Sequence, residues 1–329
     1  MAFVQSCLNL VLESDRTLRT ELTIGEDGRL WQWEVPYACV QFPVLDFSMT
    51  NQEGILRWEE SIAREVMPLL DTPLYQFMII RIGEHEGEIL VKTHHLISDG
   101  WSQVALINKI AVAYLNLIEG KAAGLEVTPS YRLHVEDEQK YLHSKMHSKD
   151  QEYWKEVLKN VSSPASLKEC HSADVSPVGH RKTFYLTEIM NHALNAFCLR
   201  SRVAPFAVFY MAIAIYLKRT RGVDRFCMGA PVHNRASFTD RKTTGMFVST
   251  LPFFSNISEE WSFEEFNSYL ADQWLTLLRH QRLSYAEIFA ISKEENPSVH
   301  RLYHLVLSFH NSQAYKNHNT SVEFSGQWH

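Results

Sequence analysis

The stretch Thr93-His94-His95-Leu96-Ile97-Ser98-Asp99-Gly100-Trp101-Ser102 decides the fold of this chain. Before it, residues 88–93 read EILVKT, which places Ile89 and Val91 on one face of a strand. After it, residues 104–118 are apolar nearly all round and are soon followed by Gly120, a helix C-terminal signal. The pattern predicts a strand–turn–helix junction that holds an imidazole rigidly at the end of a strand.

The two histidines of this stretch have different expected roles. If the strand continues through the pair, His94 and His95 point to opposite faces, so only one can serve a given site. Asp99 can order the turn by reaching back to it, and Gly100 permits backbone angles that other residues resist. For a bare HxxxD pattern, a junction with two satisfied structural histidines is the more common interpretation, since short motifs match by accident.

Composition sets the broad class of the protein. The chain has 329 residues, of which 45% are hydrophobic and 21% charged, as in globular proteins with a sizeable core and about two domains. The net charge of −6 argues against a nucleic-acid partner. No apolar run is long enough for a membrane span, and residues 2–15 indicate an amphipathic helix rather than a signal peptide. Five scattered cysteines without a CxxC pair favour a reduced, cytoplasmic protein without structural zinc.

Several further elements are predicted on both sides of the histidine stretch. Strands over 19–24 and 29–35 flank a Gly-rich turn and form one hairpin, while 74–82 and 88–93 form a second. Residues 52–70 contain a helix, and residues 131–158 are helical and polar. His143 and His147 are four residues apart there, but no Glu completes an HExxH motif, so a solvated helix is favoured over a zinc site.

The second half of the chain repeats the alternation of strands and helices. Residues 161–179 are rich in Ser, Pro and Gly, which predicts a boundary between lobes 1–165 and 166–329. After it we expect strands over 182–186, 225–229 and 302–309, and helices over 188–200, 205–221 and 261–279.

The string HHLISDGWS resembles the HHxxxDG core motif of the condensation domains of nonribosomal peptide synthetases. Other stretches resemble further motifs of that family, in order from Asp15 to Asn311. Residues 15–20 keep the LRT of RHExLRT, with Arg16-Thr17 in place of His-Glu, and residues 153–158 match YWxxxL. Residues 225–235 resemble GxPxxxR, 245–252 resemble GxFVNTLP with Ser249 for Asn, 279–281 match RHQ, and 302–311 resemble the PLFxVxFxxQN strand.

This resemblance implies an α/β fold of two chloramphenicol-acetyltransferase-like lobes that form a V-shaped pseudo-dimer with a central cleft. It implies amide formation between a carrier-bound donor acyl thioester and a carrier-bound acceptor amine. The resemblance assigns catalysis to His95 and support of the motif to His94, Asp99, Gly100 and Trp101. Asp99 is expected to pair with Arg235 of the second lobe, and Ser249 and His280 are cleft candidates.

No metal and no bound cofactor are expected, because carrier-bound thioesters are already activated. Phosphopantetheine arms would arrive with donor and acceptor peptidyl carrier proteins, and an adenylation domain would be adjacent. The family's first motif has no counterpart upstream and the chain stops at His329, so a domain truncated at both ends is expected.

Two other functions remain open on the sequence. A CoA-dependent acyltransferase shares HxxxDG and the fold, and a non-catalytic domain that recruits partners is the third possibility, although such domains typically lose the second histidine. The intact histidines argue against heterocyclisation, and Trp101-Ser102 directly after Gly100 argues against epimerisation. The acyl groups that are joined cannot be identified from the sequence.

Overall fold

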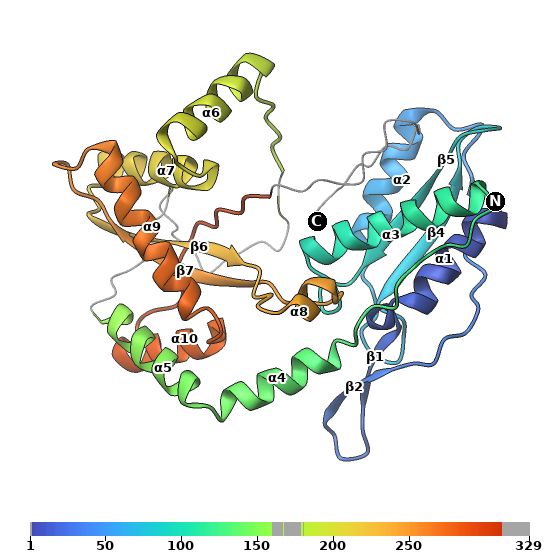
Figure 1. The fold of residues 1–329 in the computed structure, drawn as a ribbon, viewed down its shortest axis with the longest axis horizontal. Coiled ribbons are helices and arrows are strands. Elements are labelled where there is room, and N and C mark those ends of the chain that lie inside the picture. Colours follow the sequence, from blue (N-terminus) through green and yellow to red (C-terminus); the bar gives the residue numbers. More distant parts are fainter. Residues whose placement is uncertain (1, 160–166, 168–178, 180, 311–329) are drawn as a thin grey trace. The chain divides into compact units, whose positions relative to one another are not determined.

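The computed structural model describes residues 2–159, 167, 179 and 181–310, which form two compact units (Figure 1). The first unit contains residues 2–140 together with Arg235–Phe247, and the second contains the described parts of Tyr141–Asn234 and Val248–His310. The predicted boundary between residues 165 and 166 lies outside the described residues. The segment Arg235–Phe247, predicted within the second lobe, belongs to the first unit.

The first unit is built on two separate β-sheets. Strands β1 and β2 form an antiparallel hairpin, and a second sheet has the order β3-β4-β5, with β3 parallel and β5 antiparallel to β4. Both predicted hairpins are therefore confirmed. The elements are α1 (Ala2–Ser14), the 3₁₀ helix η1 (Arg16–Arg19), β1 (Thr20–Ile24), β2 (Leu30–Glu34), β3 (Val44–Asp46), α2 (Gln52–Arg64), β4 (Tyr75–Arg81), β5 (Gly87–Thr93), α3 (Gly100–Ile118), α4 (Arg132–Leu142) and α8 (Phe238–Lys242).

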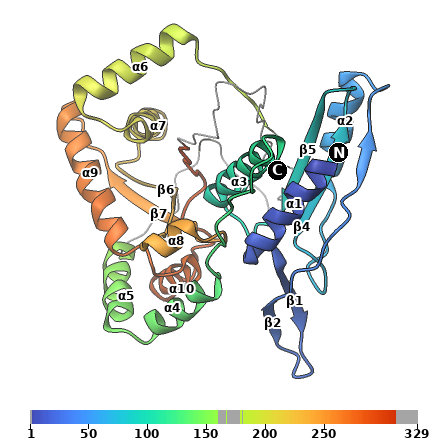
Figure 2. The same cartoon turned by 45° about the vertical axis from the view of Figure 1, so that its right-hand side comes forward.

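The core of the first unit lies between the three-stranded sheet and two helices. Helices α1 and α3 run side by side on one face of this sheet, and α2 lies against the opposite face (Figures 1 and 2). Alternate β4 side chains, Phe77 and Ile79, are buried in the same cluster as Leu8 of α1 and Leu106 of α3. Because β5 is fixed to β4 along seven residue pairs, the end of β5 is a rigid point from which the histidine turn departs.

The second unit is organised around the antiparallel pair β6 and β7, which runs in register from Arg225–Asn256 to Val232–Ser249. Tyr210 donates from its hydroxyl to the Phe253 carbonyl at 3.2 Å, which ties α7 to β7. The elements are α5 (Lys145–Leu158), α6 (Glu188–Ser201), α7 (Pro205–Arg221), β6 (Arg225–Val232), β7 (Ser249–Asn256), α9 (Phe263–Arg279) and α10 (Tyr285–Glu295).

Local signals account for the ends of these helices. The Thr187 side chain caps α6, as predicted, by accepting from the Met190 N–H. Ser262 and Glu265 form a capping box that starts α9. Gly222 ends α7 with a φ of 66°, a left-handed conformation that glycine adopts without a steric penalty.

Three predicted elements are wrong or incomplete. Residues 182–186 form no strand, and residues 302–309 contribute only a bridge at Val306, with backbone bonds between Gly229 and its neighbours Leu305 and Leu307. The helix predicted over 131–158 breaks at residues 143–144, because Ser144 leaves the helical conformation to cap α5.

The break changes the environment of the two histidines in this region. His147 is half-buried, with Nε2 at 2.7 Å from Glu287 Oε1 of α10, whereas His143 is exposed between the two helices. The two side chains therefore do not share one helix face, and His147 is not on a solvated surface. Among the described helices, none has both the length and the apolarity of a membrane span; α6 and α7 reach them only as a pair bent by 98°.

Candidate active site

The histidine stretch forms a tight turn between β5 and α3. Strand β5 ends at Thr93, so the strand does not run through His94 and His95, and the expected alternation of the two rings across a sheet does not apply. The Gln103 amide on α3 donates to the Thr93 hydroxyl, which links the two ends of the turn. Ile97, Ser98 and Asp99 are buried in the turn, so its later half is part of the core.

His94 is held by the turn itself. Its backbone N–H donates to the Leu74 carbonyl at 2.8 Å, and its Nδ1 accepts from the Leu96 N–H at 3.1 Å. An accepting Nδ1 requires an unprotonated nitrogen. Partial burial, and then the nearby His95, lower the pKa of the His94 imidazole, which favours the same neutral form. The geometry agrees with the structural role predicted for His94.

His95 differs from its neighbour because it is exposed. No hydrogen bond from the described part of the chain reaches its imidazole, so both ring nitrogens can face a substrate. Gly100 follows as the first residue of α3, where backbone N–H groups have no acceptor within the helix.

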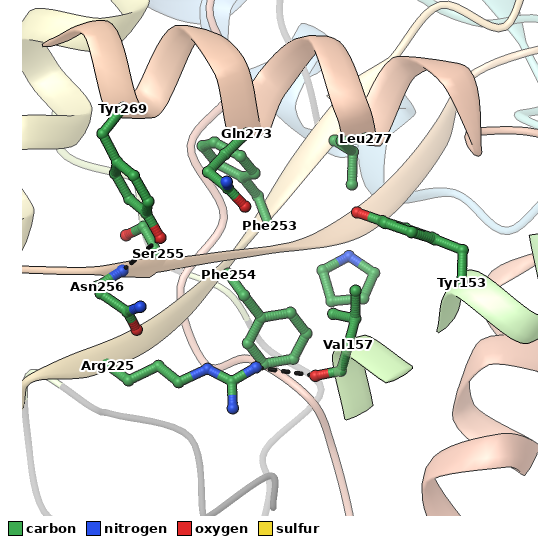
Figure 3. Close-up of a pocket in the computed structure, with 11 residues that line it drawn as sticks. Tyr153, Val157, Arg225, Phe253, Phe254, Ser255, Asn256, Tyr269, Gln273 and Leu277 are labelled. Carbon is green, nitrogen blue, oxygen red and sulfur yellow. Dashed lines mark hydrogen bonds between the residues drawn. The ribbon is translucent and has the colours of Figure 1, made fainter. Parts of the chain in front are cut away.

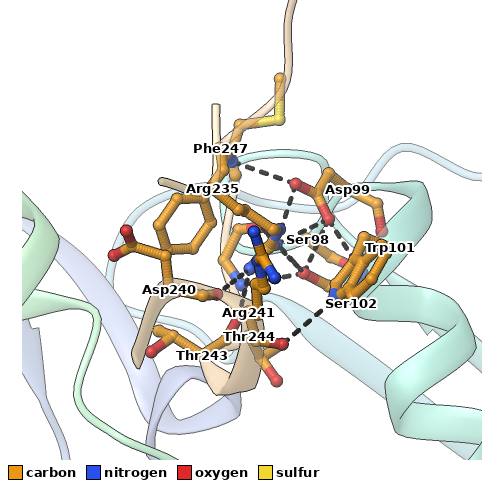
Figure 4. A network of polar contacts seen from close by, with 12 residues as sticks. Ser98, Asp99, Trp101, Ser102, Arg235, Asp240, Arg241, Thr243, Thr244 and Phe247 are labelled. Carbon is orange, nitrogen blue, oxygen red and sulfur yellow. Dashed lines mark hydrogen bonds and ion pairs between the residues drawn. The ribbon is translucent and has the colours of Figure 1, made fainter. Parts of the chain in front are cut away.

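Asp99 is the most heavily bonded side chain of the turn (Figure 4). It caps α3 by accepting from the Ser102 N–H at 2.8 Å, and it also accepts from the Ser102 hydroxyl at 2.8 Å. Arg235 Nη2 lies 3.0 Å from both carboxylate oxygens, and the Phe247 N–H donates to Oδ2 at 3.1 Å. The predicted buried ion pair between Asp99 and Arg235 is confirmed.

Arg235 is a buried cation that organises its own segment. Its Nη1 donates to the carbonyls of Asp240 and Thr243, at 2.5 and 2.6 Å, and its guanidinium stacks 3.9 Å from the centre of the Phe247 ring. Burial lowers the pKa of the guanidinium, while Asp99 counteracts this effect. Since an arginine pKa starts near 12.5, the group remains protonated at neutral pH.

Ser102 is the residue of this network to which sequence reasoning assigned no role. Its buried hydroxyl accepts from Arg235 Nη2 and from the Gly245 N–H, at 2.9 and 3.0 Å. It can donate its one hydrogen to Asp99 Oδ1 or to the Gly245 carbonyl. Its place directly after Trp101 in the motif was the only available signal.

The Arg235–Phe247 segment contacts the first unit at further points. The Tyr131 hydroxyl donates to the Met246 carbonyl at 2.6 Å, and burial raises the pKa of this phenol to about 12, so it stays a neutral donor. The Tyr131 ring fills the space beside Gly245, where an added Cβ would lie 2.2 Å from Tyr131 Cδ2. Trp101 donates from Nε1 to the Arg241 carbonyl at 3.1 Å.

The two cleft candidates lie in the second unit. Ser249 begins β7, and His280 follows the last residue of α9. His280 Nδ1 lies 2.7 Å from Asp150 Oδ1, and Tyr141 donates to Asp150 Oδ2 at 2.6 Å. The His280 ring stacks on Tyr153 at 4.0 Å. This buried carboxylate with two donors gives His280 a structural environment of its own.

A cavity of about 260 Å³ also lies in the second unit, between α5, α9 and the β6–β7 pair (Figure 3). Its wall is aromatic, with Tyr153, Phe254 and Tyr269, and Arg225 is the charged residue that lines it. The Arg225 guanidinium already donates to the Val157 carbonyl at 2.8 Å. Within residues 2–159 and 181–310, no three His, Cys, Asp or Glu side chains are grouped to bind a metal ion.

The family model described as "Condensation domain" matches residues 1–327. The chain is 29% identical over 329 residues to surfactin synthase subunit 1 of Bacillus subtilis (strain 168), covering 98% of this chain and 9% of that protein. It is 26% identical over 331 residues to a plipastatin synthase from the same organism, covering 98% of this chain and 13% of that protein. The chain thus spans about a tenth of the length of these relatives.

Solved structures have the same fold. A crystal structure of the starter condensation domain of rhizomide synthetase in complex with C8-CoA is 25% identical, with a TM-score of 0.79. The match covers 93% of this chain and 69% of that one. The α/β fold expected from the sequence is therefore confirmed.

Proposed function

This chain belongs to the condensation domain family of nonribosomal peptide synthetases, and from that premise we propose that it joins a carrier-bound acyl thioester to a carrier-bound amine at His95. Condensation domains catalyse amide bond formation. The observation that supports the role of His95 is the contrast between the paired rings. The Nδ1 of His94 is occupied by the Leu96 N–H, whereas the exposed ring of His95 has no partner among the described residues.

The proposed reaction needs a base and no covalent enzyme intermediate. The neutral amine attacks the thioester carbonyl, the C–N bond forms, and the C–S bond breaks. The proton that the amine loses is taken by the neutral His95 ring and passed to the leaving thiolate, so the imidazole is unchanged after one turnover. A positioned base of this kind contributes about 10²–10⁴-fold in rate.

The network around Asp99 supports this role by making the turn rigid. His95 lies four residues before Asp99, whose carboxylate is fixed by the Ser102 N–H and hydroxyl, Arg235 and the Phe247 N–H. Catalysis by positioning depends on such rigidity, because a misplacement of about 1 Å can cost about 10²-fold in rate. The Gly100 N–H at the start of α3 is the proposed donor to the oxyanion.

The proposed partners are a donor and an acceptor peptidyl carrier protein, with an adenylation domain adjacent; in synthetases, condensation domains work with such domains in one chain. The test is to incubate the protein with two carrier proteins, one loaded with an acyl group and one with an amino acid, and to detect the amide by mass spectrometry. The same acyl group as a CoA thioester is the second arm, because the rhizomide domain was solved with C8-CoA. Turnover of CoA thioesters alone would favour a CoA-dependent acyltransferase, and no product from either donor would favour a recruiting domain.

A further inference from the structure

Four consecutive residues of the Arg235–Phe247 segment are bonded to the rest of the first unit. Gly245 bonds to Ser102, the Met246 carbonyl to Tyr131, and the Phe247 N–H to Asp99, as described above. Thr244 adds a contact away from the histidine motif. Its hydroxyl donates to Asp15 Oδ2 at 2.6 Å, and its carbonyl accepts from the Thr17 hydroxyl at 2.8 Å.

The Thr244 contact is deeply buried. Asp15, Thr17 and Thr244 are 0%, 1% and 2% exposed. Asp15 Oδ2 also lies 3.3 Å from Lys109 Nζ, and the same ammonium donates to the Thr128 hydroxyl. A buried carboxylate is costly unless it is paired and hydrogen-bonded, so the Thr244 hydroxyl and Lys109 are both needed to keep Asp15 ionised in place.

Lys109 connects this contact to the helix that begins at the active turn. Lys109 and Ser102 are both on α3, seven residues apart, which places them on one face and about 10 Å apart along the axis. The segment that carries Thr244 and Gly245 is therefore attached to α3 at two separated points, through Asp15–Lys109 and through Ser102. Two attachments on one face fix both the position of the segment along α3 and its rotation.

We propose that Thr244 is a positioning residue for His95. By holding its backbone against Asp15 and Thr17, Thr244 sets where the Gly245 peptide groups meet Ser102 and where the Phe247 N–H meets Asp99. Those contacts orient the Asp99 carboxylate and with it the turn that carries His95. The inference rests on the proposed function of His95.

The neighbouring residue Thr243 provides a matched control. It is 4% exposed, against 2% for Thr244, but its hydroxyl donates to the Thr239 carbonyl at 2.9 Å, within its own segment. A loss of general stability should follow from either Thr243→Val or Thr244→Val. A loss of positioning should follow only from Thr244→Val, because valine keeps the shape of threonine and removes the hydroxyl.

The experiment compares Thr244→Val, Thr244→Ser and Thr243→Val in the whole protein, well below their melting temperatures. We expect kcat for amide formation to fall about 10-fold in Thr244→Val, to recover in Thr244→Ser, and to stay at the wild-type value in Thr243→Val. The NMR signals of the His94 and His95 rings should move in Thr244→Val and not in Thr243→Val. If Thr244→Val does not fold, Thr17→Val removes the other bond to Thr244 and takes its place.

The two readouts separate this inference from the proposed function. If the wild-type protein forms no amide, the proposed function fails, but displaced ring signals in Thr244→Val would still support the positioning of the turn. Ring signals that stay in place in Thr244→Val would overturn the inference, whether or not kcat falls. Equal effects of Thr243→Val and Thr244→Val on both readouts would overturn it as well.

Discussion

The guanidinium of Arg235 and the carboxylate of Asp99 form an ion pair with almost no access to solvent. Arg235 Nη2 lies 3.0 Å from each carboxylate oxygen, and the two side chains are 2% and 0% exposed. The residues are 136 positions apart in the chain. The pair therefore joins the histidine turn to the Arg235–Phe247 segment through charges that water cannot screen.

Removal of one partner of this pair should be strongly destabilising. We expect Asp99→Asn and Arg235→Gln each to lower the free energy of unfolding by about 3–5 kcal/mol, because the remaining charge stays buried without its partner. The double variant should lose much less than the sum of the two. Denaturant unfolding measures this coupling, and the exposed pair Arg132–Glu136 is the control, with an expected coupling below about 1 kcal/mol. Additive losses at Asp99 and Arg235 would contradict the pairing.

The two histidines should respond in opposite ways to truncation. His95→Ala should lower the rate of amide formation by about 10²–10⁴-fold with an unchanged melting curve, because the ring is exposed and makes no bond to the described residues. His94→Ala should instead lower stability by about 1 kcal/mol, because the Leu96 N–H loses its acceptor. Circular dichroism melts and mass-spectrometric product assays check both. A His95→Ala protein that works at the wild-type rate would refute the catalytic role.

Stability should depend on pH through His94. Its pKa is lower in the folded protein than the ordinary value of 6.5, so as pH falls the unfolded chain binds a proton first. The contribution of neutral His94 is thus complete above about pH 6.5 and is lost as pH falls toward the folded pKa. His94→Asn keeps an acceptor for Leu96 and does not titrate, so it should lose less stability than wild type between pH 7.5 and 5.5. Denaturant unfolding at both values tests this, with His85→Asn, an exposed histidine, behaving as wild type.

The Asp150 cluster should stabilise the second unit without taking part in the reaction. Burial, and then the bond to Asp150, raise the pKa of Tyr141, so its phenol is a neutral donor to a buried carboxylate. Tyr141→Phe should cost about 1.5–3 kcal/mol, the range for hydrogen bonds to charged groups. Tyr185→Phe, at a residue that is 90% exposed, should cost nothing measurable. Equal melting temperatures of the two variants would show that the Asp150 bond carries no stability.

The sequence alone determined the local structure on which the site depends. Alternating apolar residues identified both hairpins, and an Asp-Gly pair before an apolar run identified the start of α3. These features depend on neighbours within a few residues, so their physics is contained in a short window. The ordered motifs also indicated the family and the pairing of Asp99 with Arg235.

Only the tertiary structure decided how that pairing is completed. It ended β5 one residue before the histidines, placed Arg235–Phe247 in the first unit, and brought Thr244 against Asp15, 229 residues away. A serine hydroxyl or a glycine peptide group has no preferred distant partner, and it bonds to whichever groups the packed core brings within about 3 Å. Ser102, Gly245 and Thr244 acquired their contacts in this way, because burial leaves each polar group with only the partners that folding supplies.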